Sequence, residues 1–215
     1  MYATVFNVVY LGVITNALLI ASCLPMVVLL VTTDPMHSWP LLALAAPLCA
    51  PGIAAAFRVF REQAAGGNTP ARAFWAGLKA TWRKALAIGV TATAVMVVVL
   101  VDLRMVAEAT IGMLVGPMLL VVGLVTLATT LLALVALAEE PGARLRDIVK
   151  AAAVLSTRRW YLTAVSLLAL AAQVWLFVSM PAIALGITAS AALYLAWANS
   201  RYSLRPVLDL EPAVA

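Results

Sequence analysis

The sequence predicts an all-α protein, a polytopic transmembrane helical bundle of about six spans with both termini on the cytoplasmic side. Three observations lead to this prediction. Hydrophobic residues make up 65% of the 215 residues and charged residues 11%, whereas a soluble domain has roughly 25% charged residues. Six apolar runs approach the ~20 residues that cross a bilayer. Finally, almost all basic residues fall in the termini and connections that six spans would place on one side of the membrane.

The predicted spans lie within a single integral membrane domain of residues 1–215, at about residues 5–31, 39–59, 85–103, 111–137, 161–178 and 181–198. Only Ser179, Met180 and Pro181 separate the last two spans, which therefore form a tight hairpin. The first run is longer than the apolar region of a signal peptide and lacks a basic start, so we expect it to be retained.

The distribution of positive charge predicts the orientation. Six spans put both termini and the connections after the second and fourth spans on one side, together with thirteen of the fourteen Lys and Arg residues. Only Arg104 lies on the other side. The positive-inside rule places the thirteen in the cytoplasm, so we expect a multi-pass protein of the cell inner (plasma) membrane. The net charge of +5 then reflects topology and not nucleic-acid binding.

Two short amphipathic helices are predicted on the cytoplasmic side. The first starts at Thr69 and Pro70, a capping hydroxyl followed by a proline at the first helical position, and it runs straight into the third span. Its apolar face is predicted to hold Phe74, Leu78 and Trp82. The second follows Pro141, with an apolar stripe at Leu145, Ile148, Ala152 and Leu155.

Basic side chains on these two helices are the candidate binding residues: Arg72, Lys79, Arg83, Lys84, Arg158 and Arg159. Two interpretations stand. The residues contact lipid headgroups at the membrane surface, or they dock a cytoplasmic partner. Because a helix turns by about 100° per residue, Arg72, Lys79 and Arg83 share a face about 120° from the Phe74–Leu78–Trp82 stripe.

Three glycines in the fourth predicted span are candidate helix-packing residues. Gly112 and Gly116 form a GxxxG motif, and Gly123 lies on nearly the same face. Small residues at this spacing allow two helix backbones to approach closely. The contact lies either within the bundle or with another protein.

The sequence offers no catalytic set, metal site or cofactor motif, so we expect no enzyme. His37 is the single histidine, and Cys23 and Cys49 lie inside predicted spans without a CxxC arrangement. The glycines of "AAGGNTP" lack the Walker pattern. Amides in the spans either mark a transport path or join helices by hydrogen bonds; they are Asn7, Asn16, Gln173 and Asn199.

Three segments resemble the YesL-like family of small bacterial integral membrane proteins, a domain of unknown function: "TNALLIASCLP", "APGIAAAFRVFRE" and "FWAGLKATWRKALAIGV". The positions that match are Asn16, Leu24, Pro25, Pro51, Gly52, Ala56, Phe74, Trp82 and Lys84. The resemblance covers about the first hundred residues. This chain departs from the family pattern by a longer apolar stretch between Pro25 and Pro51, which bears on the register of the first two spans.

The resemblance implies which proteins accompany this one and does not imply a chemical activity. Family members commonly accompany carbohydrate ABC importers. The expected function is therefore a non-enzymatic accessory or scaffold protein beside such an importer, with importer subunits and membrane lipids as partners. The alternative is a stand-alone small-solute transporter or channel. The sequence does not indicate a substrate or an oligomeric state.

Overall fold

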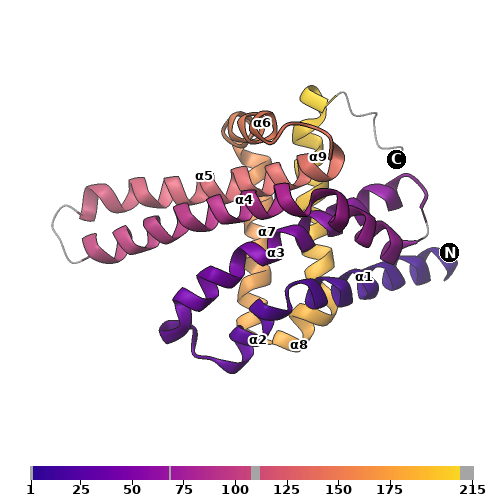
Figure 1. Cartoon of the computed structure of the whole chain (residues 1–215), viewed down its shortest axis with the longest axis horizontal. Coiled ribbons are helices and arrows are strands. Elements are labelled where there is room, and N and C mark those ends of the chain that lie inside the picture. The colour runs from indigo at the N-terminus through magenta and orange to yellow at the C-terminus, as the bar shows by residue number, and fades with distance from the viewer. Residues whose placement is uncertain (1, 68, 108–111, 209–215) are drawn as a thin grey trace.

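The protein is built from helices throughout the part that the computed structural model describes, residues 2–67, 69–107 and 112–208, of which 2–8 and 205–208 are described by backbone alone (Figure 1). The all-α fold class is therefore confirmed. Five helices are long and apolar enough to cross a membrane, and the number is six if one bent pair near the N-terminus forms a single span. The chain is a multi-pass membrane protein.

The prediction that residues 5–31 form one continuous helix is wrong. The segment consists of α1 (Tyr2–Ser22) and α2 (Leu24–Thr32), which are bent by 78° at Cys23. Pro25 explains the break, because its ring lacks an amide hydrogen and would clash with the carbonyl of Ala21 in a straight helix. The apolar pattern continues across Cys23 without interruption, so hydropathy alone does not show the bend.

The second span is longer than predicted and holds three internal prolines. Helix α3 (Pro35–Ala64) includes the predicted residues 39–59 and keeps Pro40, Pro47 and Pro51 within it. Asp34 caps its start, where the carboxylate accepts a hydrogen bond of 2.9 Å from the Met36 amide. This short polar connection after α2 is the turn that the sequence predicts there.

The first predicted cytoplasmic helix is not a separate element. Residues 69–84 and the predicted span 85–103 belong to one helix, α4 (Pro70–Val106). Its start at Pro70 is as predicted, but the Thr69 hydroxyl forms no capping bond. The second cytoplasmic helix is confirmed as α6 (Leu145–Arg158), whose buried face includes Ile148, Ala152 and Leu155.

The predicted apolar face of the first half of α4 coincides only in part with the face that is buried in the bundle. Phe74 is fully buried, but Leu78 is only partly buried and Trp82 is exposed. The buried face instead follows Phe74, Gly77, Thr81, Ala85 and Ile88. Small residues fit part of this face because α3 lies close against α4 at Gly77, where an added Cβ would meet Arg58 and the Ala55 Cα.

The remaining spans follow the predicted order. Helix α5 (Gly112–Glu139) covers the fourth span, and α7 (Trp160–Ser179) the fifth. The break around Met180 is confirmed, since α8 (Pro181–Ile183) begins directly after it. A π-helical turn, η1 (Ala184–Thr188), then leads into α9 (Ala189–Leu208) and was not predicted.

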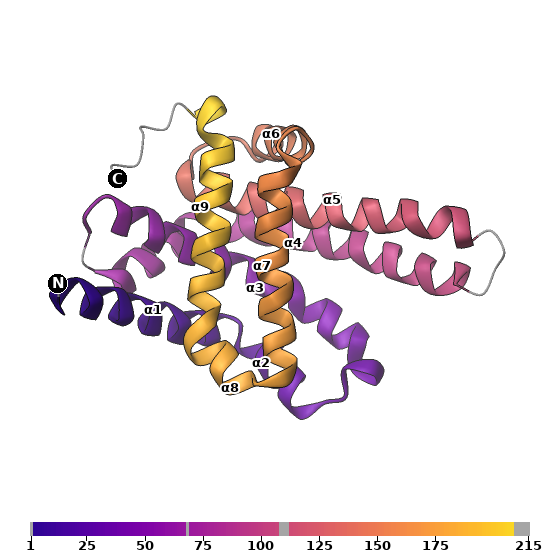
Figure 2. The ribbon, with the colours of Figure 1, turned by 180° about the vertical axis from the view of Figure 1, so that it is seen from behind.

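The helices converge at one end of the molecule and spread apart at the other. In Figure 1, α6, the start of α1, the end of α9 and the connection between α3 and α4 lie towards the top and right. The α4–α5 hairpin extends to the left, while α7 and α9 run down to α8. Figure 2 shows α7 and α9 crossing in front of α4 and α5 from behind.

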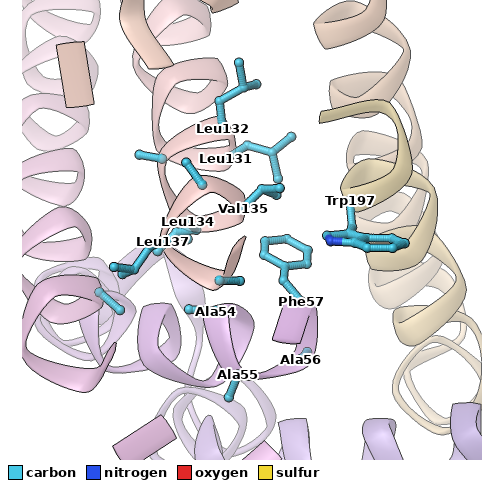
Figure 3. Close-up of a cluster of buried hydrophobic side chains, with 14 of the residues drawn as sticks. Ala54, Ala55, Ala56, Phe57, Leu131, Leu132, Leu134, Val135, Leu137 and Trp197 are labelled. Carbon is cyan, nitrogen blue, oxygen red and sulfur yellow. The ribbon is translucent and has the colours of Figure 1, made fainter. Parts of the chain in front are cut away.

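The core lies where α3, α5 and α9 meet. Small residues of α3, Ala54 to Ala56, let the longer side chains of α5 between Leu131 and Leu137 pack closely. Figure 3 shows Phe57 of α3 beside Val135 of α5 and Trp197 of α9. All three side chains are buried, so this cluster joins helices that are far apart in the sequence.

Glycines set the spacing between α3 and α4. A Cβ atom at Gly77 would lie 2.9 Å from Arg58 Cδ, and one at Gly89 would lie 2.8 Å from the Ala50 Cβ and 3.0 Å from the Pro47 carbonyl oxygen. No real Cβ approaches another atom this closely without displacement. The two helices therefore touch backbone to backbone at Gly89.

Replacing Gly89 by leucine should destabilise the protein by about 1–3 kcal/mol, because the side chain would push α3 and α4 apart. The matched control is Gly116→Leu, at a glycine with no atom within 4 Å of an added Cβ. Thermal unfolding in detergent is the measurement. Equal midpoints for the two variants would contradict the close contact.

Candidate functional site

A buried carboxylate marks the end of the bundle where the helices converge. Glu139, the last residue of α5, is 3% exposed. Trp197 Nε1 donates a hydrogen bond of 3.1 Å to its Oε1. Arg201 Nε lies 3.6 Å from Oε1, and Arg61 Nε lies 3.5 Å from Oε2. We call these four residues the Glu139 node.

The partners of Glu139 come from two other helices. Trp197 and Arg201 are four residues apart on α9, so they lie on one face, and the Arg201 guanidinium lies over the Trp197 ring, 5.2 Å from its centre. Arg61 of α3 also donates a hydrogen bond of 3.1 Å to the Ala138 carbonyl. The node therefore ties α3, α5 and α9 together at one point.

Aromatic side chains enclose the node. The Phe60 ring meets the Tyr194 ring edge-on at 5.4 Å and the Trp197 ring at 6.1 Å. Glu139 itself is buried, and burial strengthens its attraction to the two arginines. Both carboxylate oxygens face cations or a donor, so the arrangement is that of a fixed ion pair and not that of a free base or nucleophile.

Sequence reasoning missed this site. It ends the fourth span at residue 137, places Glu139 in a connection, and finds no acidic or basic side chain in the middle of a span. The carboxylate lies at the end of the span, but it faces inward. The available signal was a pair of glutamates directly after an apolar run, combined with an aromatic residue and an arginine four apart on the last helix.

Lys84 is half-buried and forms hydrogen bonds within the bundle. Its Nζ donates hydrogen bonds of 2.7 Å to the Pro141 carbonyl and 2.8 Å to the Ala143 carbonyl. These carbonyls follow the C-terminus of α5, where cations are favoured. Lys84 thus fixes the turn between α5 and α6 onto α4.

The other predicted basic residues of α4 are exposed. Arg72, Lys79 and Arg83 have no ion-pair partner among the described residues. Trp75 and Trp82 are 51% and 47% exposed on the same side of the helix, and the Arg83 guanidinium lies 5.2 Å from the centre of the Trp82 ring. We call these five residues the α4 basic–aromatic face.

The two residues of the basic pair before α7 differ in their contacts. Arg158 is exposed, whereas Arg159 donates a hydrogen bond of 3.1 Å to the Tyr202 carbonyl and lies over the Tyr202 ring. Arg159 therefore joins the start of α7 to the end of α9. Of the six predicted docking residues, four remain exposed: Arg72, Lys79, Arg83 and Arg158.

The three glycines of α5 do not share one helix contact. Gly123 faces Val99 and Met96 of α4, whose atoms lie 3.5 Å and 3.8 Å from an added Cβ. An added Cβ at Gly116 meets nothing within 4 Å, and one at Gly112 meets only the chain at Val106 and Ala107. Contact within the bundle is thus present at Gly123 and absent at Gly116.

Two of the amides in the spans hold the π-helical turn. Asn16 Nδ2 donates to the Gly186 carbonyl at 2.9 Å, and its Oδ1 accepts from the Ser190 amide at 2.7 Å. Gln173 Nε2 donates to the Ala184 carbonyl at 2.8 Å. These bonds satisfy backbone groups near the turn and join helices, which is the second of the two interpretations of the amides.

The structure describes the side chain of one of the remaining two amides and not that of the other. Asn199 Nδ2 is buried without a hydrogen-bond partner among the described residues. The side chain of Asn7 lies outside the described residues.

The cysteines and the histidine have local partners. The thiols of Cys23 and Cys49 lie within hydrogen-bonding reach of each other, so the bend after α1 faces the middle of α3. His37 Nδ1 lies 2.9 Å from Asp34 Oδ2 on the surface. The Met36 amide and this imidazole lower the pKa of Asp34. No three His, Cys, Asp or Glu side chains in the described part come close enough to hold a metal ion.

Comparisons with protein-family models, with curated proteins and with solved structures give no match to this chain. The resemblance to the YesL-like family therefore stays a hypothesis. The class of protein, a multi-pass helical membrane protein with a buried ionic node, follows from the chain's own geometry.

Replacing Glu139 by alanine should destabilise the protein by about 3 kcal/mol, because two arginines would lose their buried counter-charge. Arg61 is 39% exposed, so water offsets part of the cost. Glu140→Ala is the matched control, since that neighbouring residue is exposed. Thermal unfolding in detergent should show a clear drop for Glu139→Ala alone, and an equal drop in both variants would refute a stabilising node.

Proposed function

We propose that this protein is a non-enzymatic accessory or scaffold protein of the cell inner membrane, with both termini in the cytoplasm. The α4 basic–aromatic face docks a partner subunit of a transport system. The observation that carries the proposal is that this face is exposed while α4 itself is held against the rest of the bundle. Phe74 is fully buried on the opposite side of α4, and Lys84 fastens the helix to the turn after α5.

Composition favours a protein partner with an acidic surface. Tryptophan and arginine are the residues enriched among those that contribute most to protein–protein binding, and Arg72, Lys79 and Arg83 supply positive charge beside Trp75 and Trp82. A face of this kind also suits lipid headgroups, so lipid contact is the competing interpretation. The resemblance to the YesL-like family adds carbohydrate ABC importer subunits as the candidate partners.

The polar groups inside the bundle support an accessory role over a transporter. Glu139 is paired with two arginines, and Asn16 and Gln173 bond the backbone around η1. Carriers driven by protons or sodium place an ionisable group on the substrate path. A stand-alone small-solute transporter or channel remains the alternative, and uptake by liposomes that contain the purified protein alone would favour it.

Reversing two charges tests the docking face. Arg72→Glu with Lys79→Glu should reduce co-purification of importer subunits in mild detergent by about tenfold at low salt, and less at high salt. The matched control is Arg146→Glu with Lys150→Glu, which removes equal charge from exposed positions of α6. Thermal unfolding verifies that both double variants are folded.

The same variants separate partner from lipid and test the orientation. Partner binding should occur on inside-out vesicles and not on right-side-out vesicles, and only the α4 double variant should lose it. An unchanged pull-down, together with weaker binding of the α4 double variant to anionic liposomes, would leave lipid contact as the role of the face. Binding on right-side-out vesicles would contradict the proposed orientation.

A further inference from the structure

A large apolar groove opens between α3 and α4. The two helices touch at Gly89 and Pro47 and then diverge towards the start of α3 and the end of α4, as the spread of the helices in Figure 1 suggests. The groove holds a cavity of about 1120 Å³ whose lining runs from Ile53 and Gly89 to Trp39 and Arg104.

Small side chains make the groove deep. Ala43, Ala46 and Ala50 line it from α3, and Ala92 lines it from α4. Leu127 and Leu134 line it from α5, and Met26 lines it from α2. The floor is hydrocarbon along its whole length, apart from the hydroxyls of Thr93 and Thr130.

The charge of the groove is confined to its wide end. Arg104 is the one charged residue that lines the groove within the described part of the chain. It is exposed, and Trp39, which is 45% exposed, lines the same end from α3. Arginine and tryptophan are typical of the level of the lipid headgroups, where one end of a side chain is apolar and the other polar.

The length of the groove fits an acyl chain. From Trp39 to Ile53 the groove follows fourteen residue steps of α3, which at 1.5 Å per residue is about 21 Å. The hydrocarbon core of a bilayer is about 30 Å thick. A partner helix would have to pack across the full thickness, whereas the groove is shorter than the hydrocarbon core.

We propose that this groove binds a glycerophospholipid with an anionic headgroup, with the phosphate at Arg104 and an acyl chain between α3 and α4. The cation at the wide end complements the headgroup, and the apolar floor complements the chain. This site is separate from the α4 basic–aromatic face, which lies on the other half of α4, so neither proposal depends on the other.

Native mass spectrometry of the full chain tests the site. Detergent-purified protein is offered dioleoyl-phosphatidylglycerol and dioleoyl-phosphatidylcholine at equal concentration. One favourable contact between a cation and an anionic lipid corresponds to about a fivefold preference for phosphatidylglycerol. Arg104→Gln should abolish this preference and Arg104→Lys should retain it, because lysine keeps the charge. Arg146→Gln, at an exposed position on α6, should leave it unchanged.

A second variant tests the acyl-chain part of the site. Ala46→Phe places a ring inside the groove and should reduce the retention of both lipids while leaving the preference between them. Thermal unfolding verifies that the variants are folded. Equal retention of the two lipids by the unaltered protein would overturn the proposal. An unchanged preference for phosphatidylglycerol in Arg104→Gln would also overturn it. The proposal would be overturned as well if Ala46→Phe retained both lipids unchanged but lost a co-purifying membrane protein, because a protein would then be the occupant of the groove.

Discussion

The buried carboxylate of Glu139 is the constraint on which the rest of the structure depends. A charge removed from water is costly unless cations and donors replace the water. Arg61, Trp197 and Arg201 are brought to it from α3 and α9. Because these helices are remote in sequence, satisfying one carboxylate fixes the end of the bundle at which all three meet.

Convergence at the Glu139 node explains the spread of the helices elsewhere. Small residues of α3 bring α4 and α5 close near that end, and α3 lies close against the backbone of α4 at Gly89. Beyond it no glycine holds α3 against α4, and the groove opens. The same geometry therefore yields a rigid end with an exposed basic–aromatic face and an open end with an apolar groove.

Apolar run length and turn residues were sufficient to predict the helical class, the connections and α6, because in a membrane each span must be a long apolar helix. The bend at Cys23 was not predictable from hydropathy, since residues on both sides are equally apolar. The apolar pattern of α4 did not show which of its residues face α3, because an apolar residue of a membrane protein packs equally well against a helix or against lipid. In this helix Gly77 and Thr81 face α3, and Trp82 lies outside. The Glu139 node and the bonds of Lys84 join segments more than fifty residues apart, and no local pattern encodes such pairing.

The coupling between Glu139 and Arg201 tests the central role of the node most directly. A double-mutant cycle with Glu139→Gln, Arg201→Gln and the double variant gives this coupling from unfolding free energies measured in detergent. The account predicts that the two losses are strongly non-additive, with a coupling of about 1 kcal/mol or more, because each residue neutralises the other. Additive losses would contradict it and would mean that the carboxylate and the guanidinium stabilise the bundle independently.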